Sequence, residues 1–377
     1  MLPDYVFSRE KILPVIIAKL IVDLQYNTYF MKGFVRRIDA KAFLALAGAH
    51  LIVDVRSPKE FTEGHITGAV NISLFTDDER AVIGTLYQKQ GREPAILKGL
   101  DFALPKVFDY LSSLKKAAKG KTICLHCWRG GLRSEMLAEV FSKAGYQVFL
   151  LEGGYKAYRR LIRDSFSVPA KIIVLGGYTG CGKTDILKSL ARMGEQVIDL
   201  ESLASHKGSV FGALGQGLQP TNEQFENELY NTWSGMDPGR RLWLEDESRS
   251  IGRVALPPPV YEHISNGRMV KVILDKKIRI GRLVEEYAGF DKELLAAALL
   301  RIGEGLGGTR YNLAMEALER DDFGLVADLV LEYYDKAYQK SIDKRKCREI
   351  LDIELKGPDP SLHAKAILEM LKKNNHE

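Results

Sequence analysis

Cysteines and long apolar runs are scarce in this chain of 377 residues. Four cysteines in so long a chain do not form a disulfide framework, and their number is typical of a reducing compartment, so we expect a cytoplasmic protein. The apolar stretch at residues 11–24 is interrupted by Pro14, Lys19 and Asp23, and it is shorter than the roughly 20 residues that cross a bilayer. No small-residue cleavage site follows it, which argues against a secretory signal. We therefore expect no membrane partner.

A strong excess of one charge is also missing. The 54 basic and 49 acidic residues give a net charge of +5, which permits a polyanionic partner without requiring one. Because the chain is longer than one hydrophobic core usually organises, we expect two domains. We place an N-terminal extension at residues 1–34, a first domain at 35–166 and a second domain at 167–377. Met31 is an alternative start of the chain.

Buried strands and helices alternate along the predicted first domain. Continuous apolar runs of strand length occur at residues 50–55, 121–127 and 147–152, and such runs are typical of strands covered on both faces. A turn and a short strand are expected at 59–73, and helices over most of 76–119. This alternation predicts an α/β fold with a parallel sheet, whose sites gather at the carboxyl ends of the strands.

The predicted second domain repeats the α/β pattern. Residues 171–194 indicate a strand, a glycine-rich loop and a helix, and further strands are expected at 196–202 and 240–248. Residues 276–377 are mainly helical in pattern. We therefore predict a second α/β domain with a helical C-terminal part.

The stretch HCWRGGLRS places Cys127 at the carboxyl end of a predicted strand, before a helix that opens at Ser134. Backbone N–H groups at such a place form a cradle that binds an anion and lowers the pKa of a thiol at its centre, so we expect a nucleophilic thiolate. The predicted anion loop comprises Trp128, Arg129, Gly130, Gly131, Leu132 and Arg133. Its two arginines would add positive charge.

Cys124 is interpreted differently, as a buried packing residue. A redox pair of Cys124 and Cys127 is disfavoured because a strand turns the two side chains to opposite faces. A zinc site is disfavoured as well, since no second Cys or His pair has ligand spacing.

The stretch GGYTGCGKT contains the pattern G-x-x-x-x-G-K-T between a predicted strand and a helix, which is the context that a phosphate-binding P-loop requires. The predicted phosphate-binding residues are Gly177, Gly180, Gly182, Lys183 and Thr184. Lys183 would reach the outer phosphate oxygens, and Thr184 would ligate Mg²⁺ if a metal is bound. Glu245 or Asp246 is the expected acidic partner. Cys181 fills space in the loop. A P-loop indicates phosphate but does not identify the ligand.

The quoted stretches carry a resemblance to known families. VDVRSPKEFTEGHITGAVNI together with HCWRGGLRS resembles a rhodanese domain, whose nucleophilic cysteine carries a persulfide or perselenide and falls on Cys127. The spacing C-x5-R from Cys127 to Arg133 is longer by one residue than in ordinary sulfurtransferases, and it equals that of the related dual-specificity phosphatases. The loop is therefore suited to a phosphate-like or selenium-bearing group.

The order of further stretches is similar to that of the tRNA 2-selenouridine synthase family over about residues 35–340. These stretches are TLYQKQGREPAILKG, LEGGYKAYR, DLESLASHKGSVFG, WLEDESRSIG and YYDKAY. The resemblance implies that the wobble 2-thiouridine of tRNA is first S-geranylated by geranyl diphosphate. Selenium from selenophosphate, carried as a perselenide on Cys127, then replaces the sulfur. It also implies tRNA as a partner and a selenophosphate supply enzyme as a further one.

Two other functions stay open from the residues themselves. One is a rhodanese-type phosphatase or plain sulfurtransferase that uses Cys127, and the other is a P-loop kinase or NTPase with an inert rhodanese module. The P-loop ligand also stays open between geranyl diphosphate, a nucleotide and a tRNA phosphate.

Basic clusters are the candidates for holding the tRNA backbone, because Lys and Arg supply most phosphate contacts. They comprise Arg159, Arg160, Arg163, Lys276, Lys277, Arg279, Arg282, Lys344, Arg345, Lys346 and Arg348. Trp128 is placed to stack on a flipped base. A solvated helix face and a packing role are the alternatives.

Overall fold

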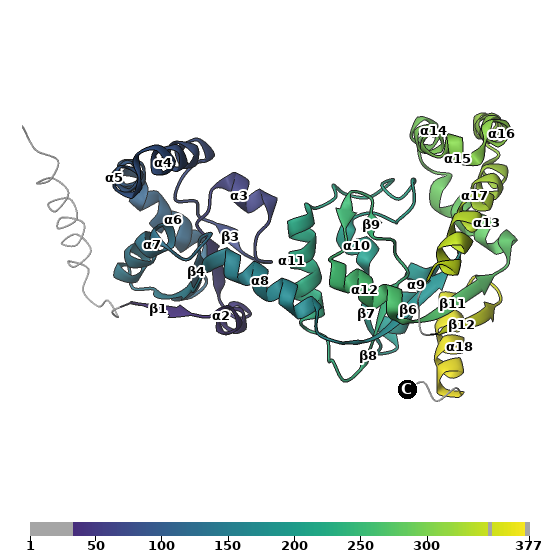
Figure 1. Ribbon diagram of the computed structural model, residues 1–377, viewed down its shortest axis with the longest axis horizontal. Helices are drawn as coiled ribbons and strands as arrows, with labels where there is room; N and C mark the ends of the chain where they lie inside the picture. Colours follow the sequence, from purple (N-terminus) through teal and green to yellow (C-terminus); the bar gives the residue numbers. More distant parts are fainter. Residues whose placement is uncertain (1–32, 346–348, 374–377) are drawn as a thin grey trace, which may run out of the picture. The chain divides into compact units, whose positions relative to one another are not determined.

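A computed structural model describes residues 33–345 and 349–373 (Figure 1). These residues divide into two compact units, and the division falls after Ile162, a few residues before the predicted boundary at 166. Nearly all of the predicted N-terminal extension, residues 1–32, lies outside the described residues. No helix in the described part of the chain is long and apolar enough to cross a membrane.

The first unit contains a parallel sheet of five strands in the order β1-β5-β4-β2-β3. The strands are β1 (Phe34–Ile38), β2 (Leu51–Asp54), β3 (Val70–Asn71), β4 (Thr122–His126) and β5 (Gln147–Leu151). Strand β4 is central, and its buried run from Ile123 to His126 is covered on both faces. Cys127 follows this strand directly, so it lies at the carboxyl edge of the sheet, as the sequence predicts.

Helices cover the sheet of the first unit (Figure 1). They are α2 (Ala40–Ala47), α3 (Pro58–Glu63), α4 (Asp77–Gln90), α5 (Arg92–Ala103), the short 3-10 helix η1 (Leu104–Lys106), α6 (Val107–Ala117), α7 (Leu132–Lys143) and α8 (Gly154–Phe166). Helix α3 replaces part of the expected turn. It forms because the Ser57 side chain caps the backbone of Glu60, the Glu60 carboxylate returns to the Ser57 N–H, and Pro58 begins the first turn.

The second unit contains another parallel sheet, in the order β12-β11-β6-β8-β7. Its strands are β6 (Lys171–Gly177), β7 (Gln196–Ile198), β8 (Arg241–Glu245), β11 (Arg268–Leu274) and β12 (Ile350–Leu355), and an antiparallel hairpin joins β9 (Ser250–Ile251) to β10 (Val254–Ala255). The C-terminal part is mainly helical, as expected, and β12 is the one strand described within residues 276–345 and 349–373. It lies at the sheet edge, and its alternating exposure leaves no continuous apolar run.

Helices of the second unit supply the rest of its fold. They are α9 (Lys183–Arg192), α10 (Leu200–Ala204), α11 (Asn222–Trp233), α12 (Pro258–Asn266), α13 (Lys276–Tyr287), α14 (Lys292–Arg301), α15 (Gly303–Leu306), α16 (Gly308–Glu319), α17 (Phe323–Asp343) and α18 (Pro360–Lys373). Helices α14 to α17 enclose an apolar cluster of their own, in which Leu299, Ala314 and Val330 are buried. Helix α17 also extends toward the P-loop, which makes it part of the site described below.

Candidate active sites: the Cys127 loop and the P-loop cavity

The Cys127 side chain is buried and lies against the first turn of α7. Its Sγ is 3.2 Å from the Ser134 hydroxyl oxygen, which also lies 2.9 Å from the Gly131 carbonyl oxygen, so the single hydroxyl proton can turn from the carbonyl to a charged sulfur. The helix begins at Leu132, with Gly131 as N-cap, so it starts two residues before the expected Ser134. Sequence reasoning did not assign Ser134 a role, although a hydroxyl directly after C-x5-R was visible. It is positioned to stabilise a charge on the sulfur.

The backbone between Cys127 and α7 has the character of an anion cradle. Within the described chain, the N–H groups of residues 128–131 donate no hydrogen bond. They stand next to a helix N-terminus, where the helix dipole adds positive potential. The arrangement suits an anionic group on or beside the sulfur.

Two glycines allow the loop to close on the start of α8. Gly130 has φ of 65°, and a Cβ there would lie 2.7 Å from the Leu151 carbonyl oxygen. A Cβ on Gly154, which has φ of 60°, would lie 2.4 Å from the Cys127 carbonyl oxygen. That carbonyl accepts a hydrogen bond from the Tyr155 N–H at 2.9 Å. Only glycine fits such approaches without a shift of backbone.

The two arginines that were expected to add positive charge to the Cys127 loop are arranged differently. Arg133 forms a bidentate pair with Glu60, at 2.6 and 3.2 Å, and this pair holds the pKa of Glu60 below its usual value although burial raises it. Arg129 and Leu132 are exposed. Beneath the loop, the buried Arg56 guanidinium lies 3.8 Å from the centre of the Tyr155 ring. Backbone dipoles therefore supply much of the local positive potential.

Cys124 is fully buried in β4. Burial raises the pKa of its thiol to about 11, which keeps it neutral near pH 7. These facts agree with a packing residue.

The P-loop connects β6 to α9. Gly177, Gly180 and Gly182 have φ of 143°, 82° and 76°, in the region that favours glycine. Gly182 is the N-cap of α9 and has no side chain to occupy the first-turn N–H groups. The Lys183 ammonium donates to the Gly177 carbonyl at 3.3 Å and lies 3.5 Å from Glu245. In this arrangement the lysine is held at the mouth of the loop.

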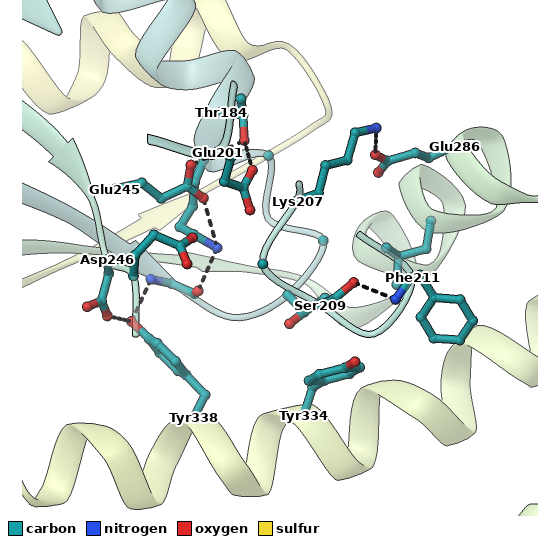
Figure 2. A pocket seen from close by; sticks show the side chains of 18 of the residues that line it. Thr184, Glu201, Lys207, Ser209, Phe211, Glu245, Asp246, Glu286, Tyr334 and Tyr338 are labelled. Atoms are coloured by element: carbon teal, nitrogen blue, oxygen red, sulfur yellow. Dashed lines mark hydrogen bonds and ion pairs between the residues drawn. The ribbon is translucent and has the colours of Figure 1, made fainter. Parts of the chain in front are cut away.

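Three carboxylates meet beside the P-loop, and Figure 2 shows two of them, Glu201 and Glu245, next to Thr184. Glu201, Glu245 and Glu247 each place a ligand oxygen within 4.8 Å of the others. The Thr184 hydroxyl lies 3.2 Å from Glu201 and 3.3 Å from Glu245. Burial, and then the neighbouring carboxylates, raise the pKa of Glu201 to about 8 and that of Glu247 well above its usual value. Such a cluster gains stability from a cation, and its hard oxygen donors fit Mg²⁺.

Glu201 and Glu247 were missed by sequence reasoning, which named only Glu245 and Asp246 near this place. Glu201 lies in α10, just after β7, and β7 pairs with β8, whose end carries Glu245. Glu201 could therefore have been recognised only from the pairing of β7 with β8, because both strands are followed or ended by an acidic residue. That pairing depends on strand order, which the sequence does not display.

Asp246 points away from the carboxylate cluster (Figure 2). It accepts a hydrogen bond from the Tyr338 hydroxyl at 3.0 Å and forms a buried ion pair with Arg345. The same Tyr338 hydroxyl accepts from the Gly177 N–H at 2.7 Å. Asp246 thus ties α17 to the P-loop.

A cavity of about 1320 Å³ opens from the P-loop. One end is polar and carries Lys183, Thr184 and the carboxylate cluster. The other end is mostly apolar, with the Lys207–Glu286 ion pair beside it. Its lining side chains include Phe211, Leu295, Phe323, Val326, Val330 and Tyr334. The cavity therefore fits an amphiphile with a phosphorylated head.

Several of the basic residues proposed to hold tRNA are occupied by ion pairs. Arg279 is buried and pairs with Asp335, Arg282 pairs with Asp185, and Lys276 pairs with Asp328. Arg345 is held by Asp246, and Arg159 is buried, while Lys346 and Arg348 lie outside the described residues. The exposed members in the described part of the chain are Arg160, Arg163, Lys277 and Lys344. Trp128 is half-buried and tilts against the Tyr155 ring.

A cysteine loop on a rhodanese-type sheet and a P-loop α/β unit define a two-domain enzyme of the transferase class. Residues 39–161 match the rhodanese-like domain family, and residues 170–315 match the family described as tRNA 2-selenouridine synthase AAA domain. The chain belongs to the tRNA 2-selenouridine synthase family.

The similar curated proteins share this name. A tRNA 2-selenouridine synthase of Shewanella loihica is 35% identical over 81% of this chain and 90% of its own length. One of Sulfurovum sp. is 34% identical over 79% and 90%. One of Nitrosomonas europaea is 31% identical over 82% and 93%. The similarity therefore spans both units.

Proposed function

We propose that the enzyme exchanges sulfur for selenium at the wobble 2-thiouridine of tRNA in two steps, one at each site. The P-loop cavity geranylates the sulfur, and the Cys127 loop then delivers selenium. The observation that carries the proposal is the cavity with a phosphate-binding end and an apolar end. A nucleotide would bring a ribose and a polar base to that apolar end, whereas geranyl diphosphate matches both ends.

The first step is an alkylation. The thiouridine sulfur forms a bond to C1 of the geranyl group, the C1–O bond breaks, and its electron pair leaves with pyrophosphate. The uridine loses one proton to solvent. Lys183 and the N-terminus of α9 stabilise the negative charge that grows on the leaving group. Mg²⁺ held by Glu201, Glu245 and Glu247 would neutralise further charge on the diphosphate.

The second step uses the sulfur of Cys127 as selenium carrier. Its thiolate forms an S–Se bond with selenophosphate while the Se–P bond breaks, which gives a perselenide. For the electrons to balance, phosphorus keeps the bonding pair and leaves as phosphite. The terminal selenium then attacks C2 of the uridine, and geranylthiol leaves with a proton from solvent. An external thiolate attacks the Cys127 sulfur, which releases the selenouridine and leaves Cys127 in a mixed disulfide. A second thiol reduces this disulfide and restores Cys127.

Attack on phosphorus instead of selenium is the second candidate, which the Ser134 contact and the C-x5-R spacing favour. It would produce a phosphocysteine, free selenide and finally phosphate, and it corresponds to a phosphatase-type loop. The phosphorus product therefore distinguishes the two routes.

The tRNA and its surroundings complete the proposal. Arg160, Arg163 and Lys277 are exposed and available for phosphate contacts, and Trp128 stands beside Cys127 for stacking on the target base. A selenophosphate-producing enzyme would supply the second substrate. We place the protein in the cytoplasm because Cys124, Cys127 and Cys181 are free thiols and tRNA is modified there.

The test is a staged reaction on tRNA that contains 2-thiouridine. Geranyl diphosphate is added first and selenophosphate with a thiol second, and nucleosides are identified by mass spectrometry after each stage. We expect geranyl-thiouridine and then selenouridine. Phosphorus NMR of the second stage should show phosphite for a perselenide, and phosphate would overturn that intermediate. Unchanged tRNA at both stages would overturn the function as a whole.

A further inference from the structure

One face of α17 lines the cavity from its apolar end to its polar end. Phe323, Ala327, Val330 and Tyr334 lie on this face, followed by Tyr338. Their spacing of three or four residues places them in one row along the helix. The row is apolar at the start of α17 and becomes polar near the P-loop.

The polar end of this row is fixed to the P-loop. The Tyr338 hydroxyl bonds the Gly177 N–H at 2.7 Å, and Arg279 holds Asp335 with two bonds of 2.9 and 2.8 Å while donating to the Thr179 carbonyl at 3.2 Å. These contacts join α17 to the first half of the phosphate loop, at Gly177 and Thr179. Because α17 is attached to the P-loop at Tyr338 and Asp335, each residue of the helix lies at a fixed distance from the bound phosphate.

The apolar part of the row faces a wall across the cavity. The Tyr334 hydroxyl accepts a hydrogen bond from the Val210 N–H at 3.0 Å, and Figure 2 shows Tyr334 below Ser209 and Phe211. Val330 and Ala327 are 4% and 8% exposed. Because both residues line the cavity, a larger side chain at either position would project into it.

We infer that α17 sets the length of the prenyl chain that the enzyme accepts. This rests on the proposed function. With a rise of about 1.5 Å per residue, Tyr334, Val330 and Ala327 lie roughly 6, 12 and 16 Å from Tyr338 along the helix. Each isoprene unit adds four chain bonds, about 5 Å when extended, since such bonds are about 1.5 Å long. The first unit lies along Tyr334, the second reaches Val330, and a third reaches Ala327.

The experiment measures binding of inorganic pyrophosphate and of dimethylallyl, geranyl and farnesyl diphosphates by calorimetry. The variants are Val330→Trp and Ala327→Trp, and Lys336→Trp is the control on the exposed side of α17. We expect Val330→Trp to weaken geranyl diphosphate at least tenfold and to change pyrophosphate and dimethylallyl diphosphate less than twofold. Ala327→Trp should weaken only farnesyl diphosphate, and Lys336→Trp none of the four.

A variant that is expected to bind a ligand more tightly serves as a control for misfolding, because a poorly folded protein would not gain affinity. Phe323→Ala should raise the affinity for farnesyl diphosphate relative to geranyl diphosphate severalfold. The inference is overturned if all four ligands weaken together in Val330→Trp and Phe323→Ala leaves the ratio unchanged. It is also overturned if the wild-type protein binds geranyl diphosphate no more tightly than inorganic pyrophosphate. Chain-dependent binding without alkylation of tRNA would overturn the proposed function and leave the measuring role of α17 intact.

Discussion

The Cys127 loop and the P-loop cavity are both anion sites at the carboxyl edge of a parallel sheet, but they are assembled differently. The Cys127 loop comes from one short stretch, residues 127–134, closed by Gly154, and its chemistry depends on a single buried sulfur. The P-loop cavity takes side chains from six separate stretches of the chain, and a motif accounts for only its phosphate end. A short motif therefore identifies a nucleophile well, whereas the ligand of an open cavity depends on distant residues.

The strongest separation of the two sites is expected from Cys127→Ser. A serine hydroxyl stays protonated near pH 7 and is a far weaker nucleophile, so selenation should fall by more than about a thousandfold. Geranylation should stay within twofold, since the cavity is untouched. Nucleoside mass spectrometry after each stage measures both. Equal loss of both steps in a folded variant would show that the sites do not work separately.

The reverse separation is expected from Lys183→Ala. Loss of a positive charge at the leaving pyrophosphate should lower geranylation about a hundredfold, or roughly 2.7 kcal/mol. Selenation of tRNA that is already geranylated should be unchanged. Lys188→Ala is the matched control, because Lys188 also lines the cavity but is not part of the G-K-T pattern. A similar effect of both variants would point to general charge instead of a specific contact.

A smaller effect is expected inside the Cys127 loop from Ser134→Ala. It removes the hydroxyl 3.2 Å from the sulfur, and a hydrogen bond to a charged group is worth about 1.5 kcal/mol, so selenation should fall roughly tenfold. The rate of Cys127 alkylation by iodoacetamide at pH 7 should fall in parallel. Ser134→Thr keeps the hydroxyl and should restore both. A loss of selenation without a change in alkylation would argue against this contact.

The smallest effect concerns stability of the second unit without metal. The Glu201 pKa of about 8 in the folded protein lies above its ordinary value of 4.5. The folded state therefore binds more protons between these values, and stability should fall as pH rises from about 5 to 8. The Tm of Glu201→Gln should depend less on pH by a few degrees. A wild-type Tm with the same pH profile as the variant would contradict a protonated Glu201.

Much of the fold followed from continuous apolar runs, and two of the strands that were missed, β1 and β12, share one property. β1 and β12 lie at the edges of their sheets, and each exposes charged residues on one face, such as Arg36 and Glu354. An edge strand needs only one buried face, so it lacks the run that revealed β4 and β6.

The candidate sites divide in the same manner. The P-loop residues and Cys127 were visible because backbone geometry restricts which residues fit there. Glu201, Glu247 and Tyr338 were not visible, since their roles depend on which strands and helices become neighbours. Arg133, Arg279 and Arg345 looked available in the sequence, but the fold gives each a carboxylate partner.

The division of the cavity into a polar and an apolar end also has a pharmacological consequence. Nucleotides are abundant in cells, yet they can satisfy only the phosphate end. Alkyl bisphosphonates with a short hydrocarbon chain would occupy both ends and cannot release a leaving group. They should inhibit geranylation but not the selenation of tRNA that is already geranylated. Such compounds would therefore be inhibitors of one step of the enzyme.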